Sequence, residues 1–159
     1  MIVRRMSQPR AYTRHVMLEK IDHIGVAVPD LDEAVRSYEQ LFGVEPSHRE
    51  IVESDGVETV MFEVGESRIE LLGSLGPDSK IARFLETRGG GIHHVAYGVA
   101  DVQGTLDRLA ADGVRLLDTQ PRPGAGGKLV AFVHPKAVGG VLTELCQPDP
   151  ALVGHRPLT

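Results

Sequence analysis

The chain has 159 residues, 42% of them hydrophobic and 25% charged, so it can bury a substantial core as one domain or two small fused halves. Its net charge of −5 gives no support for nucleic-acid binding. No apolar run approaches the ~20 residues of a membrane span. Cys146 is the single cysteine, which excludes an intrachain disulfide and is compatible with a reducing compartment. We therefore expect a cytoplasmic protein that binds neither nucleic acid nor membranes.

The two ends lack the patterns of folded elements. Residues 1–19 are basic but have no apolar core of the kind found in a signal peptide. Residues 148–159 are rich in proline and show no periodicity. We predict that both ends are tails and that one folded domain spans residues 20–147.

The first half of this domain, residues 20–75, begins with a strand followed by a helix. The stretch "IDHIGVAVP" is typical of a strand that stops at Pro29. Asp30 and Glu33 form a helix-capping pattern, and apolar residues then keep helical spacing up to Gly43. Strands are expected at 57–65 and 67–75, joined by a Gly-Glu turn, and a short helix over 78–90 follows.

The same pattern restarts in the second half, residues 92–147. The stretch "IHHVAYGVAD" predicts a strand, and a helix capped by Asp101 runs from there towards Gly113. Two more strands are expected at 128–136 and 140–148. Because the order is βαβββ twice, we predict an α+β fold in which two tandem βαβββ modules form a cupped mixed sheet around a metal site.

The repeat places potential metal ligands at equivalent positions. Each half has a histidine in its first strand, His23 or His94, and a glutamate in its last strand, Glu70 or Glu144. Two imidazoles and two carboxylates suit a divalent ion that keeps positions open for water or substrate. The absence of thiolates argues against a closed structural zinc site. We predict that these four residues bind one metal ion.

Strand alternation indicates that each histidine faces a cavity. His23 and His94 each share a strand face with small residues only, and the opposite faces carry bulky residues suited to packing against helices. The small residues are Gly25 and Ala27 in the first half and Ala96 and Gly98 in the second. The same alternation places His93 on the face opposite His94, and we interpret His93 as structural.

These stretches carry a family resemblance. The chain resembles the vicinal-oxygen-chelate superfamily, which is built from paired βαβββ modules, and within it the methylmalonyl-CoA epimerases. The similarity spans residues 20–147, and its most specific segments are "GGGIHHVAYGV" and "HPKAVGGVLTEL".

The resemblance implies an activity and a cofactor. The metal ligands of the family fall on His23, Glu70 (glutamine in some relatives), His94 and Glu144. The ion is expected to be cobalt, with manganese, nickel or zinc as other possible occupants. The implied reaction interconverts (2R)- and (2S)-methylmalonyl-CoA, and the protein is expected to form a homodimer.

The chemistry of this reaction explains why a metal is needed. The proton leaves a carbon that lies between a thioester carbonyl and a carboxylate, and a divalent cation bound to both groups would stabilise the resulting enolate. Epimerisation also needs acid–base groups on both faces of that carbon, or one mobile group. We interpret Glu144 as one of them. The second stays unassigned, because Thr59 occupies the position at which some relatives have a glutamate.

Some residues outside the predicted metal site are candidates for substrate contacts. The glycine-rich stretch "PRPGAGGKL", with Gly126 and Gly127, and the nearby Lys136 are candidates for contacts with a CoA thioester.

Two alternatives to the epimerase remain: a glyoxalase I-type lyase acting on a glutathione hemithioacetal, and a non-catalytic member that binds a small molecule. The complete His/Glu ligand set disfavours the second alternative, and the epimerase-like segments disfavour the first.

Overall fold

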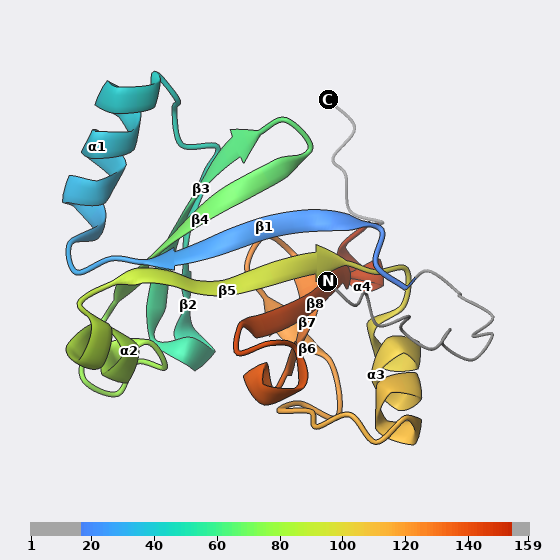
Figure 1. Ribbon diagram of the computed structural model, residues 1–159. Helices are drawn as coiled ribbons and strands as arrows, with labels where there is room; N and C mark the ends of the chain where they lie inside the picture. Colours follow the sequence, from blue (N-terminus) through green and yellow to red (C-terminus); the bar gives the residue numbers. More distant parts are fainter. Residues whose placement is uncertain (1–16, 154–159) are drawn as a thin grey trace, which may run out of the picture.

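The computed structural model describes residues 17–153, and one eight-stranded sheet forms its centre (Figure 1). The strand order is β2-β3-β4-β1-β5-β8-β7-β6. The first four of these strands come from the first half of the chain and the last four from the second half. The sheet curves into a cup, as Figure 1 shows, which confirms the predicted α+β fold with two βαβββ modules.

The two modules have matching elements. The first consists of β1 (Lys20–Ala27), α1 (Leu31–Phe42), β2 (His48–Val52), β3 (Val57–Val64) and β4 (Ser67–Ser74). The second consists of β5 (Gly91–Gly98), α3 (Val102–Ala111), β6 (Arg122–Gly124), β7 (Lys128–Val133) and β8 (Leu142–Pro148). A helix, α2 (Ala82–Arg88), connects the modules, and 3₁₀ turns occur at Glu53–Asp55 and Pro135–Ala137.

Strands β1 and β5 join the two modules at the middle of the sheet. They pair antiparallel, and each pairs on its other side in parallel with the last strand of its own module, β4 or β8. The four strands that carry the predicted ligands are therefore adjacent. This arrangement brings residues from distant parts of the sequence to the floor of one cup.

Helices α1 and α3 cover the outer faces of the modules. Helix α1 packs Leu31 and Val35 against Phe62 and Leu71 of β3 and β4. Helix α3 packs in the same way through a buried group made up of Val102, Leu106, Ala131, Val133 and Leu145. Asp30 and Asp101 cap the two helices, as predicted, by accepting hydrogen bonds from backbone N–H groups three residues later. The bulky strand faces thus form the core, and the small faces are left to line the cup.

Some elements differ from those expected from the sequence. The short edge strands β2 and β6 could not be placed by residue pattern, since their side chains are mostly exposed or half-buried. Strand β8 extends to Pro148, and a short helix, α4 (Pro150–Val153), lies within the range expected to be a tail. The rest of the predicted tails, residues 1–16 and 154–159, lies outside the described residues. None of the helices in the described part is long and apolar enough to cross a membrane.

Candidate active site

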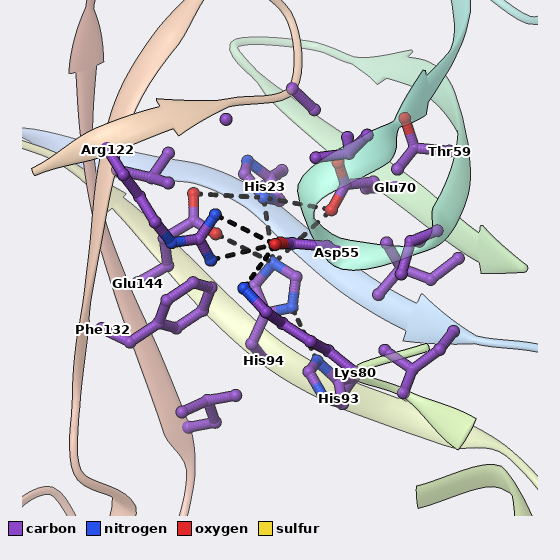
Figure 2. A pocket seen from close by; sticks show the side chains of 18 of the residues that line it. His23, Asp55, Thr59, Glu70, Lys80, His93, His94, Arg122, Phe132 and Glu144 are labelled. Carbon is purple, nitrogen blue, oxygen red and sulfur yellow. Dashed lines mark hydrogen bonds and ion pairs between the residues drawn. The ribbon is translucent and has the colours of Figure 1, made fainter. Parts of the chain in front are cut away.

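The four predicted ligands converge at the floor of the cup (Figure 2). The Nε2 atoms of His23 and His94 lie 3.1 Å apart. Glu70 Oε2 lies 3.5 Å from each of these two nitrogens. The Glu144 carboxylate lies 3.8 Å from His23 Nε2 through one oxygen and 3.6 Å from His94 Nε2 through the other. All four side chains are buried, and strands from both halves of the chain bring them together at one point.

Gly25 provides the space that His94 needs. The two residues face each other across the β1–β5 pair. A Cβ atom added at Gly25 would lie only 2.2 Å from His94 Cε1, which no real contact permits. The small strand faces predicted from the sequence therefore make room for an imidazole ring.

Two β-bulges shape the site, one in each module. The β1–β5 register shifts at Asp22 in β1 and at His93 in β5, so each of these residues is the extra one in its strand. Each immediately precedes a site histidine. A bulge turns the extra residue towards the face of its neighbour, because the strict alternation is broken there.

The bulge corrects the prediction made for His93. Strict alternation predicted that His93 lies on the opposite face of β5 from His94, but its side chain lines the cavity beside His94. The Nδ1 atoms of the two histidines lie 3.1 Å apart, and the His93 ring makes an edge contact with Phe84 of α2. His93 therefore contacts a site residue directly.

Asp22 occupies the equivalent position behind His23 and belongs to a buried charged network. Its Oδ1 accepts a hydrogen bond from His23 Nδ1 at 2.9 Å and also contacts Arg68 of β4 and Lys128 of β7. Burial alone would raise the pKa of Asp22, but the hydrogen bonds from His23 and Lys128 and the charges of Lys128 and Arg68 hold it well below its usual value. Asp22 is therefore an anion that links both modules and orients His23.

Burial and neighbouring charges together determine the protonation of the four central side chains. Burial raises the pKa of Glu144 to about 7, and the charge of Glu70 adds to this rise although His23 opposes it. Burial also raises the pKa of Glu70. Burial and the charges of His23 and His93 lower the pKa of His94 well below its usual value. For His23, burial would lower the pKa, but Asp22, Glu70 and Glu144 outweigh it and raise the pKa.

The donor set fits a divalent metal ion. His23, His94 and Glu144 form a buried group whose ligand atoms all lie within 4.8 Å of one another. The Nδ1 atom of each histidine has a partner on the far side of its ring, which leaves both Nε2 atoms directed at a shared point. A hydrogen-bonded Nδ1 that fixes the ring is the usual support of a metal-binding histidine. Glu70 lies close enough to both histidines to join this group.

The four side chains open into a cavity of about 330 Å³. Its walls are largely apolar and include Leu72, Ile81, Phe132 and Leu142. Thr59 also lines it and is buried, and its hydroxyl has no hydrogen-bond partner among residues 17–153. A buried hydroxyl that faces a cavity is a ready donor to a bound ligand. An apolar cavity with a few convergent polar groups is the usual form of a small-molecule site.

A charged cluster that the sequence pattern did not indicate lies at the mouth of this cavity. Asp55 forms ion pairs with Lys80 and Arg122, and Figure 2 shows the three side chains meeting in front of the histidines. Burial, the largest effect, would raise the pKa of Asp55, but a hydrogen bond from Lys80 and the charges of Arg122 and Lys80 outweigh it and keep this pKa below its usual value. The cluster joins β2 and β6, the two edges of the sheet.

Comparisons with known proteins agree with this geometry. The sequence profile of the Glyoxalase/Bleomycin resistance protein/Dioxygenase superfamily matches residues 22–132. The ethylmalonyl-CoA/methylmalonyl-CoA epimerase of Cereibacter sphaeroides is 41% identical over 133 residues, which are 82% of this chain and 99% of the relative. The chain belongs to this superfamily, and within it to the family of the methylmalonyl-CoA epimerases.

Solved structures of epimerases have the same fold. Streptomyces coelicolor methylmalonyl-CoA epimerase in complex with 2-nitronate-propionyl-CoA is 39% identical and superposes with a TM-score of 0.80, covering 84% of this chain and 96% of that one. A methylmalonyl-CoA epimerase in complex with methylmalonyl-CoA and ammonium gives the same TM-score, identity and coverage. The family relationship therefore covers nearly the whole of the cupped sheet.

The residues predicted to contact substrate lie at different distances from the cavity. Gly126 and Gly127 form the turn between β6 and β7, where both have positive φ, and the neighbouring Gly124 and Ala125 line the cavity. Gly126 N–H donates to Glu50 of β2, which is a second link between the sheet edges. Lys136 is exposed in the 3₁₀ turn after β7 and is not part of the cavity wall.

Proposed function

We propose that this protein interconverts (2R)- and (2S)-methylmalonyl-CoA by removing and returning the α-proton of the acyl group. The convergence of His23, His94, Glu70 and Glu144 in one apolar cavity supports this proposal most directly. The family relationship supports the substrate, since related epimerases are named for methylmalonyl-CoA and one of them holds it.

Glu144 is the proposed acid–base group. Its carboxylate faces the cavity, and in the metal-free protein burial raises its pKa to about 7. An acid–base catalyst is most effective when its pKa lies near the working pH, because it can then both accept and donate a proton. Glu144 would accept the proton from the carbon between the thioester carbonyl and the carboxylate.

His23, Glu70, His94 and Glu144 would hold a divalent ion. The family resemblance implies Co²⁺, with Mn²⁺, Ni²⁺ and Zn²⁺ as other candidates. When bound, such an ion supplies positive charge next to the oxygens on which negative charge develops as the proton leaves. The protein contributes rigidity, since Asp22 and His93 fix the two rings from behind. Apolar residues, among them Phe132 and Leu142, line the cavity beside these side chains.

The group that acts on the second face of the substrate is left unassigned. Thr59 lines the cavity, but an alcohol is not a base at neutral pH, so its hydroxyl is better suited to binding an oxygen of the substrate. Gly126, Gly127 and Lys136 remain proposed contacts of the CoA part. A homodimer, inferred from the superfamily, and a location in the cytoplasm, inferred from the unpaired Cys146, complete the proposal.

Deuterium exchange tests this function. One epimer of methylmalonyl-CoA is incubated with the metal-loaded protein in deuterated water, and deuterium at the α-carbon is followed together with the ratio of the epimers. We expect both incorporation and inversion. Activity on a glutathione hemithioacetal without exchange into methylmalonyl-CoA would instead identify a lyase, and no activity on either would indicate a binding protein.

A further inference from the structure

The charged cluster at the mouth of the cavity has a geometry of its own. The Arg122 guanidinium binds Asp55 through two nitrogens, with Nη2 3.2 Å from Oδ2 and Nη1 3.3 Å from Oδ1, and the Lys80 ammonium binds Oδ1 as well. The three residues come from β6, from the 3₁₀ turn after β2 and from the segment before α2. All three side chains line the same cavity as the histidines.

The cluster carries excess positive charge, because two cations share one carboxylate. A guanidinium has five N–H donors and an ammonium three, so most of these donors are not used by Asp55. The Lys80 side chain is 54% exposed and that of Arg122 only 27%, which places Lys80 at the rim and Arg122 deeper. Such a pair is suited to binding a second carboxylate beside that of Asp55.

Arg122 lies close to the centre of the site. Its guanidinium carbon is 5.5 Å from the centroid of the Phe132 ring, and that ring is in edge contact with the His94 ring at 5.9 Å. One aromatic ring thus contacts both Arg122 and His94. A small acyl group beside His94 is therefore also near Arg122, whereas the phosphates of CoA are separated from the acyl group by the whole pantetheine arm.

We propose that Lys80 and Arg122 form an anion site that binds the free carboxylate of the acyl group next to Asp55, the counter-ion that they already share. This inference rests on the proposed function and deepens it. It assigns to the cluster the selection of carboxylated acyl-CoA thioesters, such as methylmalonyl-CoA, over simple ones such as propionyl-CoA.

Calorimetric binding of three ligands tests the anion site. Methylmalonyl-CoA, propionyl-CoA and free CoA are titrated into the wild type, Arg122→Gln and Lys80→Gln, with Co²⁺ in excess. Because hydrogen bonds to charged groups contribute strongly, we expect Arg122→Gln to weaken methylmalonyl-CoA binding by about 10-fold or more and to leave propionyl-CoA nearly unchanged. The more exposed Lys80 should have a smaller effect in the same direction. Arg83→Gln, which removes an exposed charge from α2, serves as the matched control.

Two further variants guard against loss of structure. Arg122→Lys keeps the charge and should restore part of the preference for methylmalonyl-CoA. Asp55→Asn removes the competing carboxylate and should bind methylmalonyl-CoA more tightly relative to propionyl-CoA, a gain that unfolding cannot produce. Thermal unfolding followed by circular dichroism checks that each variant is folded.

The outcomes separate this inference from the proposed function. Equal weakening of all three ligands in Arg122→Gln would mean that the cations bind a CoA phosphate, and unchanged binding would mean that the cluster only joins the sheet edges; either result overturns the anion site. Failure of the wild type to exchange the α-proton would overturn the epimerase. The anion site would still be supported in that case if Arg122→Gln lost the preference for the carboxylated ligand.

Discussion

The two halves of the sheet present the same histidine at the same bulge but support it with different chemistry. In the first module Asp22, an anion bound to Arg68 and Lys128, stands behind His23. In the second module the equivalent bulge residue is His93. Its imidazole, and not a carboxylate, contacts the Nδ1 atom of His94. Both modules therefore have a β-bulge before the site histidine, but the residue at the bulge is an aspartate in one and a histidine in the other.

This difference gives the two site histidines opposite proton affinities. The anion of Asp22 helps to raise the pKa of His23, while burial and the neighbouring His23 and His93 lower that of His94. A metal-binding imidazole backed by a carboxylate is also a stronger ligand, because the carboxylate increases its basicity. An internal repeat can therefore keep one geometry and still make its two halves electronically unequal.

The two carboxylates, unlike the two histidines, have pKa values shifted in the same direction. Burial raises the pKa of Glu70 and also that of Glu144, which reaches about 7 although the charges of His23 and Lys128 act against the rise. At a pKa of about 7 Glu144 can both accept and donate a proton near neutral pH. We expect the first module mainly to hold the ion and the second to take part in proton transfer.

The largest effect is expected from removing either histidine. His23→Ala and His94→Ala should each abolish tight Co²⁺ binding and α-proton exchange, because each removes one of two Nε2 ligands directed at the same point. Metal content by mass spectrometry and exchange in deuterated water measure the two losses. His48→Ala, which removes a half-exposed histidine of β2, is the control. Full metal content and normal exchange in His94→Ala would rule out the shared site.

Replacing each carboxylate by an amide should distinguish the role of Glu144 from that of Glu70. Glu144→Gln is expected to lower turnover by about 10²–10⁴-fold at saturating metal, the usual contribution of an acid–base group, because an amide oxygen can bind an ion but cannot accept the proton. Glu70→Gln should keep most of the activity, because an amide oxygen can still bind the ion and Glu70 is not the proposed acid–base group.

The epimers, measured separately, sharpen this test. If Glu144 serves one face only, Glu144→Gln can still exchange the proton of one epimer without inverting it. Metal-loaded turnover and deuterium incorporation are recorded for both epimers. Wild-type turnover in Glu144→Gln would show that Glu144 is at most a ligand.

The central side chains were predictable because they depend on two simple periodicities. Strand alternation and the internal repeat placed His23, Glu70, His94 and Glu144 on inward faces, and the small residue Gly25 indicated where space is needed. Both signals are local to a strand or to one repeat. The fold followed from the same repeat.

Features that depend on pairing between segments were not predictable in this way. The bulges at Asp22 and His93 arise from the register of β1 against β5, which neither strand specifies alone, and this is why His93 was placed on the wrong face. Asp55, Lys80 and Arg122 meet only because the sheet curves its edges together. Short exposed strands such as β6, "RPG", carry no alternation that a sequence pattern could detect.

A smaller effect is expected from the residues at the bulges. Asp22→Asn should weaken Co²⁺ binding by about 10–100-fold, the usual cost of losing the hydrogen-bond partner of a metal-binding histidine. His93→Asn should have a weaker effect, because burial lowers the pKa of His93, so this half-buried imidazole supports His94 without the negative charge that Asp22 brings to His23. Competition with a chromophoric chelator measures both affinities, and nitrogen NMR of the metal-free protein reports whether His23 keeps its tautomer.

The buried network around Asp22 needs its own control. Asp22→Asn also leaves Arg68 and Lys128 without their shared anion, which destabilises the fold independently of the metal. Arg68→Gln disturbs the same network without removing the acceptor of His23. Equal loss of metal affinity in Arg68→Gln and Asp22→Asn would show that the network acts through stability and not through the orientation of His23.

The smallest effect concerns the contact that joins the two sheet edges, and it should depend on pH. Lys80 and Arg122 hold the pKa of Asp55 below its usual value, so ionised Asp55 stabilises the fold above the unfolded-state pKa of about 3.9. This stabilisation is lost as the pH falls through the lower folded-state pKa.

Asp55→Asn should therefore be less stable than the wild type at neutral pH, by about 1 kcal/mol or less for a partly exposed ion pair. Urea unfolding at a series of pH values should show the difference shrinking towards zero in acid, while Asp78→Asn, an exposed neighbour of Lys80, shows no such trend. A difference that persisted unchanged in acid would mean that Asp55 joins the halves by packing and not by charge.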